Sequence, residues 1–176
     1  MKNVLEISKK EIFPISLILI LAISRLIPHP PNFTPIIAVA IMSSCFFKNI
    51  NLSILILVVS MLLSDLFIGF YYNIFFVYFS LILITIIFFK INKKINYKTL
   101  LIFSFFGSLI FYIISNFGVW MLGNLYEKNV SGLINCYVLA IPFFKNTFLS
   151  TALFSYATYF AKNYYIKKTN IVKTNN

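Results

Sequence analysis

Six apolar segments, separated by short polar stretches, constrain the fold more than any other feature of the sequence. The segments cover residues 12–27, 36–47, 52–70, 74–89, 100–122 and a stretch within 141–161. Hydrophobic residues make up 60% of the 176 residues and charged residues 11%, whereas soluble domains are about 45–50% apolar and about 25% charged. About 20 apolar residues in a helix span a bilayer. The pattern predicts an all-α polytopic membrane protein with six transmembrane helices, and it excludes a water-soluble domain.

The polar stretches between these segments are too short to hold a soluble domain. We therefore expect a single transmembrane domain over residues 1–176, with its core at 12–162 and a flexible basic tail at about 166–176. The segments at 36–47 and 74–89 are shorter than an ideal span. Short membrane helices need neighbouring helices to satisfy their backbone groups, so the lengths favour a compact bundle.

The distribution of basic residues predicts the orientation of the chain. The formal net charge is +11, and fourteen of the fifteen basic residues are lysines. With six spans and a cytoplasmic N-terminus, twelve basic residues lie inside and three lie outside: Arg25, Lys128 and Lys145. This asymmetry follows the positive-inside rule, and it explains the charge without nucleic acid. We expect a multi-pass protein of the bacterial inner membrane, in contact with the lipid bilayer, with both termini cytoplasmic.

Polar and aromatic side chains gather at the predicted outer ends of the spans. Buried polar groups are costly in hydrocarbon unless they are paired, so this one-sided distribution indicates an outward-facing polar pocket. The alternative is a set of ordinary interfacial residues, because Tyr and Trp line both membrane surfaces. The candidate substrate-binding residues are Arg25, His29, Asn32, Asp65, Tyr72, Asn116, Trp120, Lys145 and Asn146.

The first outer loop carries four prolines within residues 28–35. Proline fixes the backbone φ angle and removes a donor, so the loop should be stiff and extended. Such a loop can hold His29 and Asn32 in place for a ligand, or it can simply connect two helices. Arg25, at the end of the first span, is an interfacial anchor, an ion-pair partner or a substrate clamp.

Asp65 is the only acidic residue inside an apolar segment. A carboxylate at membrane depth is a functional hypothesis by default. It can bind a ligand or a cation, or it can form a structural ion pair with Arg25 or Lys145. Gly69, one turn further on, allows a close approach of another helix or of a ligand.

Two later stretches add to the predicted pocket. Asn116 and Trp120 are spaced i, i+4 and share a helix face, where they can line a pocket or form an interhelical bond and an interfacial anchor. Residues 131–140 are expected to form a short surface helix, and Pro142 is expected to start a new helix. Lys145 and Asn146 would then lie in its first turns, where a cation is unfavourable unless it faces an anion. Lys145 can also be a lysine that extends to the membrane surface.

The sequence carries none of the catalytic or nucleotide-binding motifs that we sought. A G-x-x-x-x-G-K-[ST] loop is absent, so the chain cannot use ATP for transport by itself, and G-x-S-x-G and H-E-x-x-H are absent as well. Cys45 and Cys136 lack metal-ligand spacing and are expected to be buried neutral thiols. We expect no enzyme activity, no cofactor and no metal.

Four motifs resemble an uncharacterised bacterial membrane family associated with transport. They are Arg-Leu-Ile-Pro-His-Pro-Pro-Asn-Phe-Thr-Pro at 25–35, Ser-Asp-Leu-Phe-Ile-Gly at 64–69, Asn-Phe-Gly-Val-Trp at 116–120 and Ala-Ile-Pro-Phe-Phe-Lys-Asn-Thr at 140–147. The resemblance covers about residues 12–162. That family is similar to the substrate-binding (S) components of energy-coupling-factor (ECF) transporters.

The resemblance implies a six-helix bundle that binds a small molecule at an outward-facing pocket. It also implies a partner, a transmembrane energising module with ATPases. The chain departs from the S-component pattern because its first span lacks an Ala-x-x-x-Ala face, which puts docking on that module in question. Two alternatives are a scaffold protein of the cell-envelope machinery and a membrane enzyme acting on lipid or isoprenoid.

In the binding mechanism that we expect, each candidate side chain has a separate role. Asp65 and Lys145 supply charge, and Asn32 and Asn116 orient the ligand. Trp120 and Tyr72 stack against it, while His29 contacts it from the loop.

Overall fold

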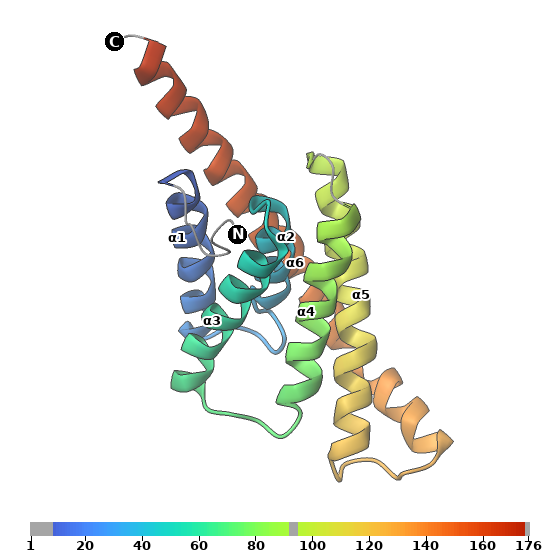
Figure 1. The fold of residues 1–176 in the computed structure, drawn as a ribbon. Coiled ribbons are helices and arrows are strands. Elements are labelled where there is room, and N and C mark those ends of the chain that lie inside the picture. The colour runs from blue at the N-terminus through green and yellow to red at the C-terminus, as the bar shows by residue number, and fades with distance from the viewer. Residues whose placement is uncertain (1–8, 92–94, 175–176) are drawn as a thin grey trace.

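The computed structural model describes residues 9–91 and 95–174, and within these ranges the protein is entirely helical (Figure 1). The predicted all-α class is confirmed. The elements are α1 (Lys9–Ile23), the 3-10 turn η1 (Ser24–Leu26), α2 (Ile36–Phe46), α3 (Ile50–Ile68), α4 (Ile74–Ile91), α5 (Tyr97–Leu122) and α6 (Val130–Thr174).

Four of these helices, α3 to α6, are long and apolar enough to cross a membrane. The helices α1 and α2 have 15 and 11 residues. At 1.5 Å per residue they reach only about 22 Å and about 16 Å, less than the roughly 30 Å of a bilayer core. The structure therefore supports a membrane protein with four candidate spans. The predicted number of helices is confirmed, and the short second segment at 36–47 corresponds to α2. Six membrane crossings stay a prediction, since four helices are long enough to be candidate spans.

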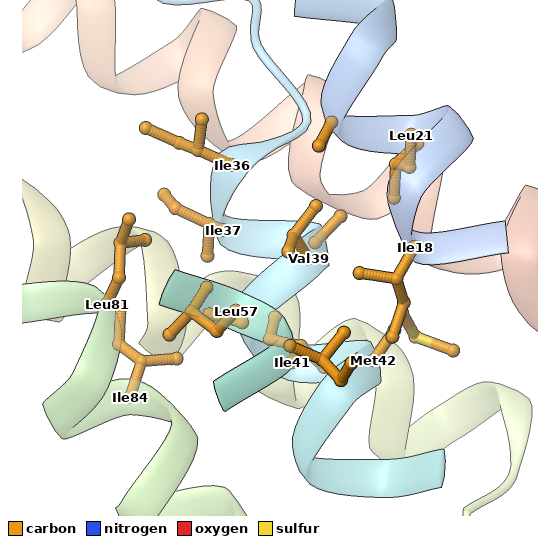
Figure 2. Packing of buried hydrophobic residues seen from close by; sticks show 14 of the residues in the cluster. Ile18, Leu21, Ile36, Ile37, Val39, Ile41, Met42, Leu57, Leu81 and Ile84 are labelled. Carbon is orange, nitrogen blue, oxygen red and sulfur yellow. The ribbon is translucent and has the colours of Figure 1, made fainter. Parts of the chain in front are cut away.

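The short helix α2 lies at the centre of the bundle. All of its residues from Ile36 to Ser44 are buried, and it packs against each of the other five helices. Figure 2 shows Ile18 of α1, Leu57 of α3 and Leu81 of α4 pointing toward it. A helix that is apolar all round belongs in a protein interior, and α2 fits that rule.

Side-chain caps and a glycine set several helix boundaries. Asn49 accepts a bond from the Asn51 backbone at the start of α3. Asn96 and Thr99 form a reciprocal capping box at the start of α5. Such caps satisfy donors that the first turn leaves open. After α3, Gly69 adopts a φ of 97°, a left-handed conformation that suits glycine and turns the chain toward α4.

The expected break near Pro142 is wrong. A single helix, α6, runs for 45 residues from Val130 to Thr174 with Pro142 inside it, and it crosses the bundle diagonally in Figure 1. Proline removes one helix bond, but packing can hold the helix together. Tyr137 donates to the Ile113 carbonyl at 2.6 Å, and Tyr112 donates to the Tyr137 carbonyl at 2.5 Å. These bonds tie the first turns of α6 to α5.

The basic tail expected at about 166–176 overlaps the end of α6. The backbone is helical as far as Thr174, and residues 175–176 lie outside the described ranges. The flexibility of this tail stays a prediction.

Candidate functional site

A polar cavity of about 260 Å³ lies where the N-terminal end of α2 meets the α3–α4 connection, the start of α4, the second half of α5 and α6. The loop at 27–35 leads from η1 to α2 and forms part of the cavity wall. The lining residues are Arg25, Asn32, Thr34, Ile36, Tyr71, Asn73, Val77, Phe111, Ser115, Asn116, Val119 and Thr147.

A buried ion pair lies at one side of the cavity, where only its arginine lines the wall. Arg25 Nη2 lies 2.9 Å from Asp65 Oδ1, and the two side chains are 8% and 0% exposed. The contact is close in distance but off the direction of an ideal hydrogen bond, since Asp65 Oδ1 has no partner of good geometry. The other carboxylate oxygen, Oδ2, accepts a 2.7 Å bond from the Tyr78 hydroxyl. The partner of Asp65 is therefore Arg25, one of the alternatives left open by the sequence.

The Arg25 guanidinium has further partners besides Asp65. Its Nη1 donates to Ser64 Oγ and contacts Met61 Sδ at 3.5 Å. Its Nε is buried and has no hydrogen-bond partner. Other atoms of the Arg25 side chain line the cavity. A buried donor without a partner costs about 1–3 kcal/mol.

Tyr71, in the connection between α3 and α4, lies beside this pair. Burial, and next the negative charge of Asp65, raise the pKa of the Tyr71 hydroxyl to about 12. The hydroxyl therefore stays protonated and can donate a hydrogen bond at any physiological pH. Tyr71 also lines the cavity, whereas the sequence pointed to Tyr72, which is 57% exposed and does not.

The proline-rich loop is fastened to α6 by two polar contacts. Asn146 Nδ2 donates to the Pro31 carbonyl at 3.0 Å, and Thr147 Oγ1 lies 3.5 Å from the Asn32 carbonyl. Asn32 has a φ of 59°, an uncommon conformation that asparagine tolerates. Asn32 lines the cavity, whereas Asn146 does not line it and instead bonds the backbone of the loop. His29 is exposed, and its Nδ1 lies 3.1 Å from the Pro30 carbonyl.

Asn116 lines the cavity, while its predicted neighbour Trp120 does not. The Asn116 side-chain amide donates through Nδ2 to the Tyr112 carbonyl at 2.8 Å. Its side-chain oxygen, Oδ1, can therefore accept a bond from a ligand. Trp120 instead donates to the Glu127 carbonyl at 2.9 Å, and Lys128 lies over its ring. Trp120 therefore stabilises the connection between α5 and α6 by contacts with Glu127 and Lys128.

Lys145 is exposed on α6 and is absent from the cavity wall. Of the nine candidate residues, the structure thus brings together Arg25, Asn32 and Asn116 around the cavity, with Asp65 behind Arg25. The sequence analysis missed three hydroxyl-bearing residues of the cavity wall: Thr34, Ser115 and Thr147. Their only signal in the sequence was a position near the predicted outer side.

The two cysteines lie outside the cavity wall. Cys136 is buried, Cys45 is half-buried, and both are free thiols. Within residues 9–91 and 95–174, no three His, Cys, Asp or Glu side chains converge.

The fold and the site together describe an all-helical protein with four candidate membrane spans and a polar cavity lined on one side by the arginine of an ion pair. Comparison with known families places the chain further. Residues 6–172 match a family of unknown function (DUF6580), and the chain belongs to that family. Neither a curated protein nor a solved structure matches the chain. The prediction of an uncharacterised family is confirmed, and the similarity to S components stays a prediction.

Proposed function

We propose that this protein captures a small molecule in the cavity beside Arg25 and acts as the substrate-binding part of a transport system. The observation that carries the proposal is the buried Arg25–Asp65 pair, whose arginine lines a polar cavity. Burying an ionisable group within a membrane segment is costly in free energy, and such groups typically mark substrate or ion pathways.

The size of the cavity supports a small ligand. Pockets for drug-sized molecules occupy about 300–1,000 Å³, and this cavity, at about 260 Å³, lies just below that range. Its wall combines polar groups such as Asn73 and Asn116 with the apolar side chains of Val77, Phe111 and Val119. Such a wall suits a compact molecule with a polar and an apolar part.

The proposal includes the orientation that the lysines predict. Six crossings with both termini cytoplasmic place the cavity at the outer face, since η1, the α3–α4 connection and the end of α5 all lie at predicted outer ends. The first two crossings then consist of α1 with η1 and of α2 with the proline-rich loop. Irregular backbone at membrane depth is tolerated when it is buried in protein or lines a cavity, and Asn32 and Thr34 of this loop line the cavity. A partner module with ATPases would supply the energy, as in ECF transporters.

Native mass spectrometry of the purified protein tests capture. A bound small molecule should accompany the wild type and should be absent from a folded Val119→Trp variant, because Val119 lines the cavity and indole would fill it. Val59→Trp is the matched control, since Val59 is 39% exposed on α3 and does not line the cavity. Binding that survives Val119→Trp would contradict the proposal. Repeated preparations that carry a stoichiometric protein partner and no small molecule would favour the scaffold alternative.

A further inference from the structure

The end of the bundle opposite the cavity carries most of the basic residues. Lys48 lies between α2 and α3, Lys90 at the end of α4 and Lys98 at the start of α5, and all three are exposed. In the proposed orientation this is the cytoplasmic end. The sequence assigns to it twelve of the fourteen lysines and two acidic residues, Glu6 and Glu11. This end is therefore strongly basic.

Two aromatic contacts hold α6 against this basic end. Lys162 Nζ lies 3.9 Å from the ring centroid of Phe46, the last residue of α2. The Tyr165 ring stacks on Phe13 of α1, with the two ring centroids 3.8 Å apart. Because Lys48 follows Phe46 by two residues, the charges of Lys48 and Lys162 belong to one surface, and packed helices support it.

Beyond these contacts α6 continues as a basic helix. Figure 1 shows its red end projecting past the start of α1 and past the rest of the bundle. The segment 162–174 is helical and carries four lysines and no acidic residue. At 1.5 Å per residue it extends for roughly 18 Å, so it reaches beyond the hydrocarbon region when the apolar part of α6 crosses a membrane. A cluster of four or more basic residues directly after a membrane helix attracts anionic lipid headgroups.

Exposed tyrosines at the same end suit the headgroup region of a bilayer. Tyr97 is 60% exposed and Tyr164 is 71% exposed. Lys98 lies over the Tyr97 ring, with its Nζ 5.9 Å from the ring centroid. Tyrosine is enriched at membrane interfaces, where its ring contacts apolar chains and its hydroxyl stays among polar groups. Tyrosines mixed with lysines, beside helices apolar enough to cross a membrane, favour a lipid partner over a soluble acidic one.

We infer that this end binds anionic phospholipids of the inner leaflet through their phosphate groups. Its lysine surface consists of Lys48, Lys90, Lys98, Lys162 and Lys167. Each lysine near an anionic leaflet adds to the attraction, which falls off within a Debye length. The inference goes beyond the proposed function. It shares the orientation with that function but uses no residue of the cavity.

Two lipids with identical acyl chains and different headgroup charge test the inference. Phosphatidylglycerol is anionic and phosphatidylethanolamine is zwitterionic. Native mass spectrometry of the full chain in detergent gives a dissociation constant for each lipid. We expect phosphatidylglycerol to bind at least tenfold more tightly, and a higher ammonium acetate concentration should narrow the difference, because salt screens exposed charges.

A pair of variants with the same net charge locates the binding. Lys98→Gln/Lys167→Gln removes two exposed lysines from the lysine surface, whereas Lys128→Gln/Lys145→Gln removes two exposed lysines from the cavity end. The preference for phosphatidylglycerol should fall at least threefold in the first variant and change less than twofold in the second. Elution as a single species and the unfolding temperature check that both variants are folded.

The outcomes decide on the lipid partner separately from capture. Equal binding of the two lipids by the wild type would overturn the inference and leave the surface to an acidic protein. An equal loss in the two variants would also overturn it, since the preference would then reflect net charge and not this surface. Neither result affects capture, which Val119→Trp tests at the opposite end of the bundle. A failure of capture likewise leaves the lipid preference standing.

Discussion

The Arg25–Asp65 pair gives the sharpest test of the structure, because neutralising one partner should cost much more than neutralising both. Removing one member of a buried pair leaves an uncompensated charge and costs about 3–5 kcal/mol, whereas replacing both members is often close to neutral. Both side chains are more than nine-tenths buried. We therefore expect Arg25→Met and Asp65→Asn each to lower the free energy of unfolding by about 3 kcal/mol. This corresponds to a factor of about 100 in the unfolding equilibrium constant.

The double variant should be only about 1 kcal/mol less stable than the wild type, since it buries no charge. Asparagine is chosen at 65 because its side-chain oxygen can still accept the Tyr78 bond. Reversible unfolding in mixed micelles, followed by circular dichroism, measures the four proteins of this cycle. Lys145→Met is the control, because Lys145 is exposed and its loss should change stability by less than about 0.5 kcal/mol. Additive losses in the double variant would refute the buried pair.

Two further predictions concern the contacts of α5 and the ionisation of Tyr71. Gly118→Ala should destabilise the protein by about 1–3 kcal/mol, because a Cβ atom there would lie 2.5 Å from the ring of Phe76. Gly107→Ala is its control, since that Cβ would meet side-chain atoms no nearer than 3.2 Å; equal losses in thermal unfolding would contradict the packing. The raised pKa of Tyr71 predicts that the difference in absorbance at 295 nm between the wild type and Tyr71→Phe titrates near pH 12. Its contribution to stability is full below about pH 10 and is lost as the pH rises through about 12; a midpoint near 10 would contradict its burial.

The helices of this protein could be predicted because apolar segments determine them almost alone. The predicted starts at residues 36 and 74 match α2 and α4, and Asn96 caps α5 ahead of its apolar run. The error at Pro142 has a different origin. The local preference of proline favours a break there. However, two hydrogen bonds join Tyr137 of α6 to Tyr112 and Ile113 of α5 and help to hold a continuous helix. Such long-range contacts have no local signal in a single sequence.

The site could be predicted only in part. The free-energy cost of burying a charge singles out ionisable residues in apolar segments, but it gives no signal for uncharged residues of the cavity wall. Asp65 stands out since a carboxylate is costly in an apolar segment. Its ion-pair partner, Arg25, lies 40 positions away in the sequence. The sequence alone could not distinguish Arg25 from Lys145 as that partner. The sequence favoured Tyr72, whereas Tyr71 lines the cavity, and this difference has another origin. Adjacent residues in a connection point in different directions, and only the path of the backbone decides which one faces the cavity.

The ion pair is better understood as a positioning device than as a source of stability. A buried pair contributes little net stability compared with apolar residues of similar size. Here, however, Asp65 and Ser64 hold the Arg25 guanidinium in place, so the part of the side chain that lines the cavity is positioned before a ligand arrives. A side chain that is ordered during folding does not have to be ordered again on binding, and this lowers the entropic cost of capture. The same argument explains why Asp65 can matter for binding although it does not line the cavity itself.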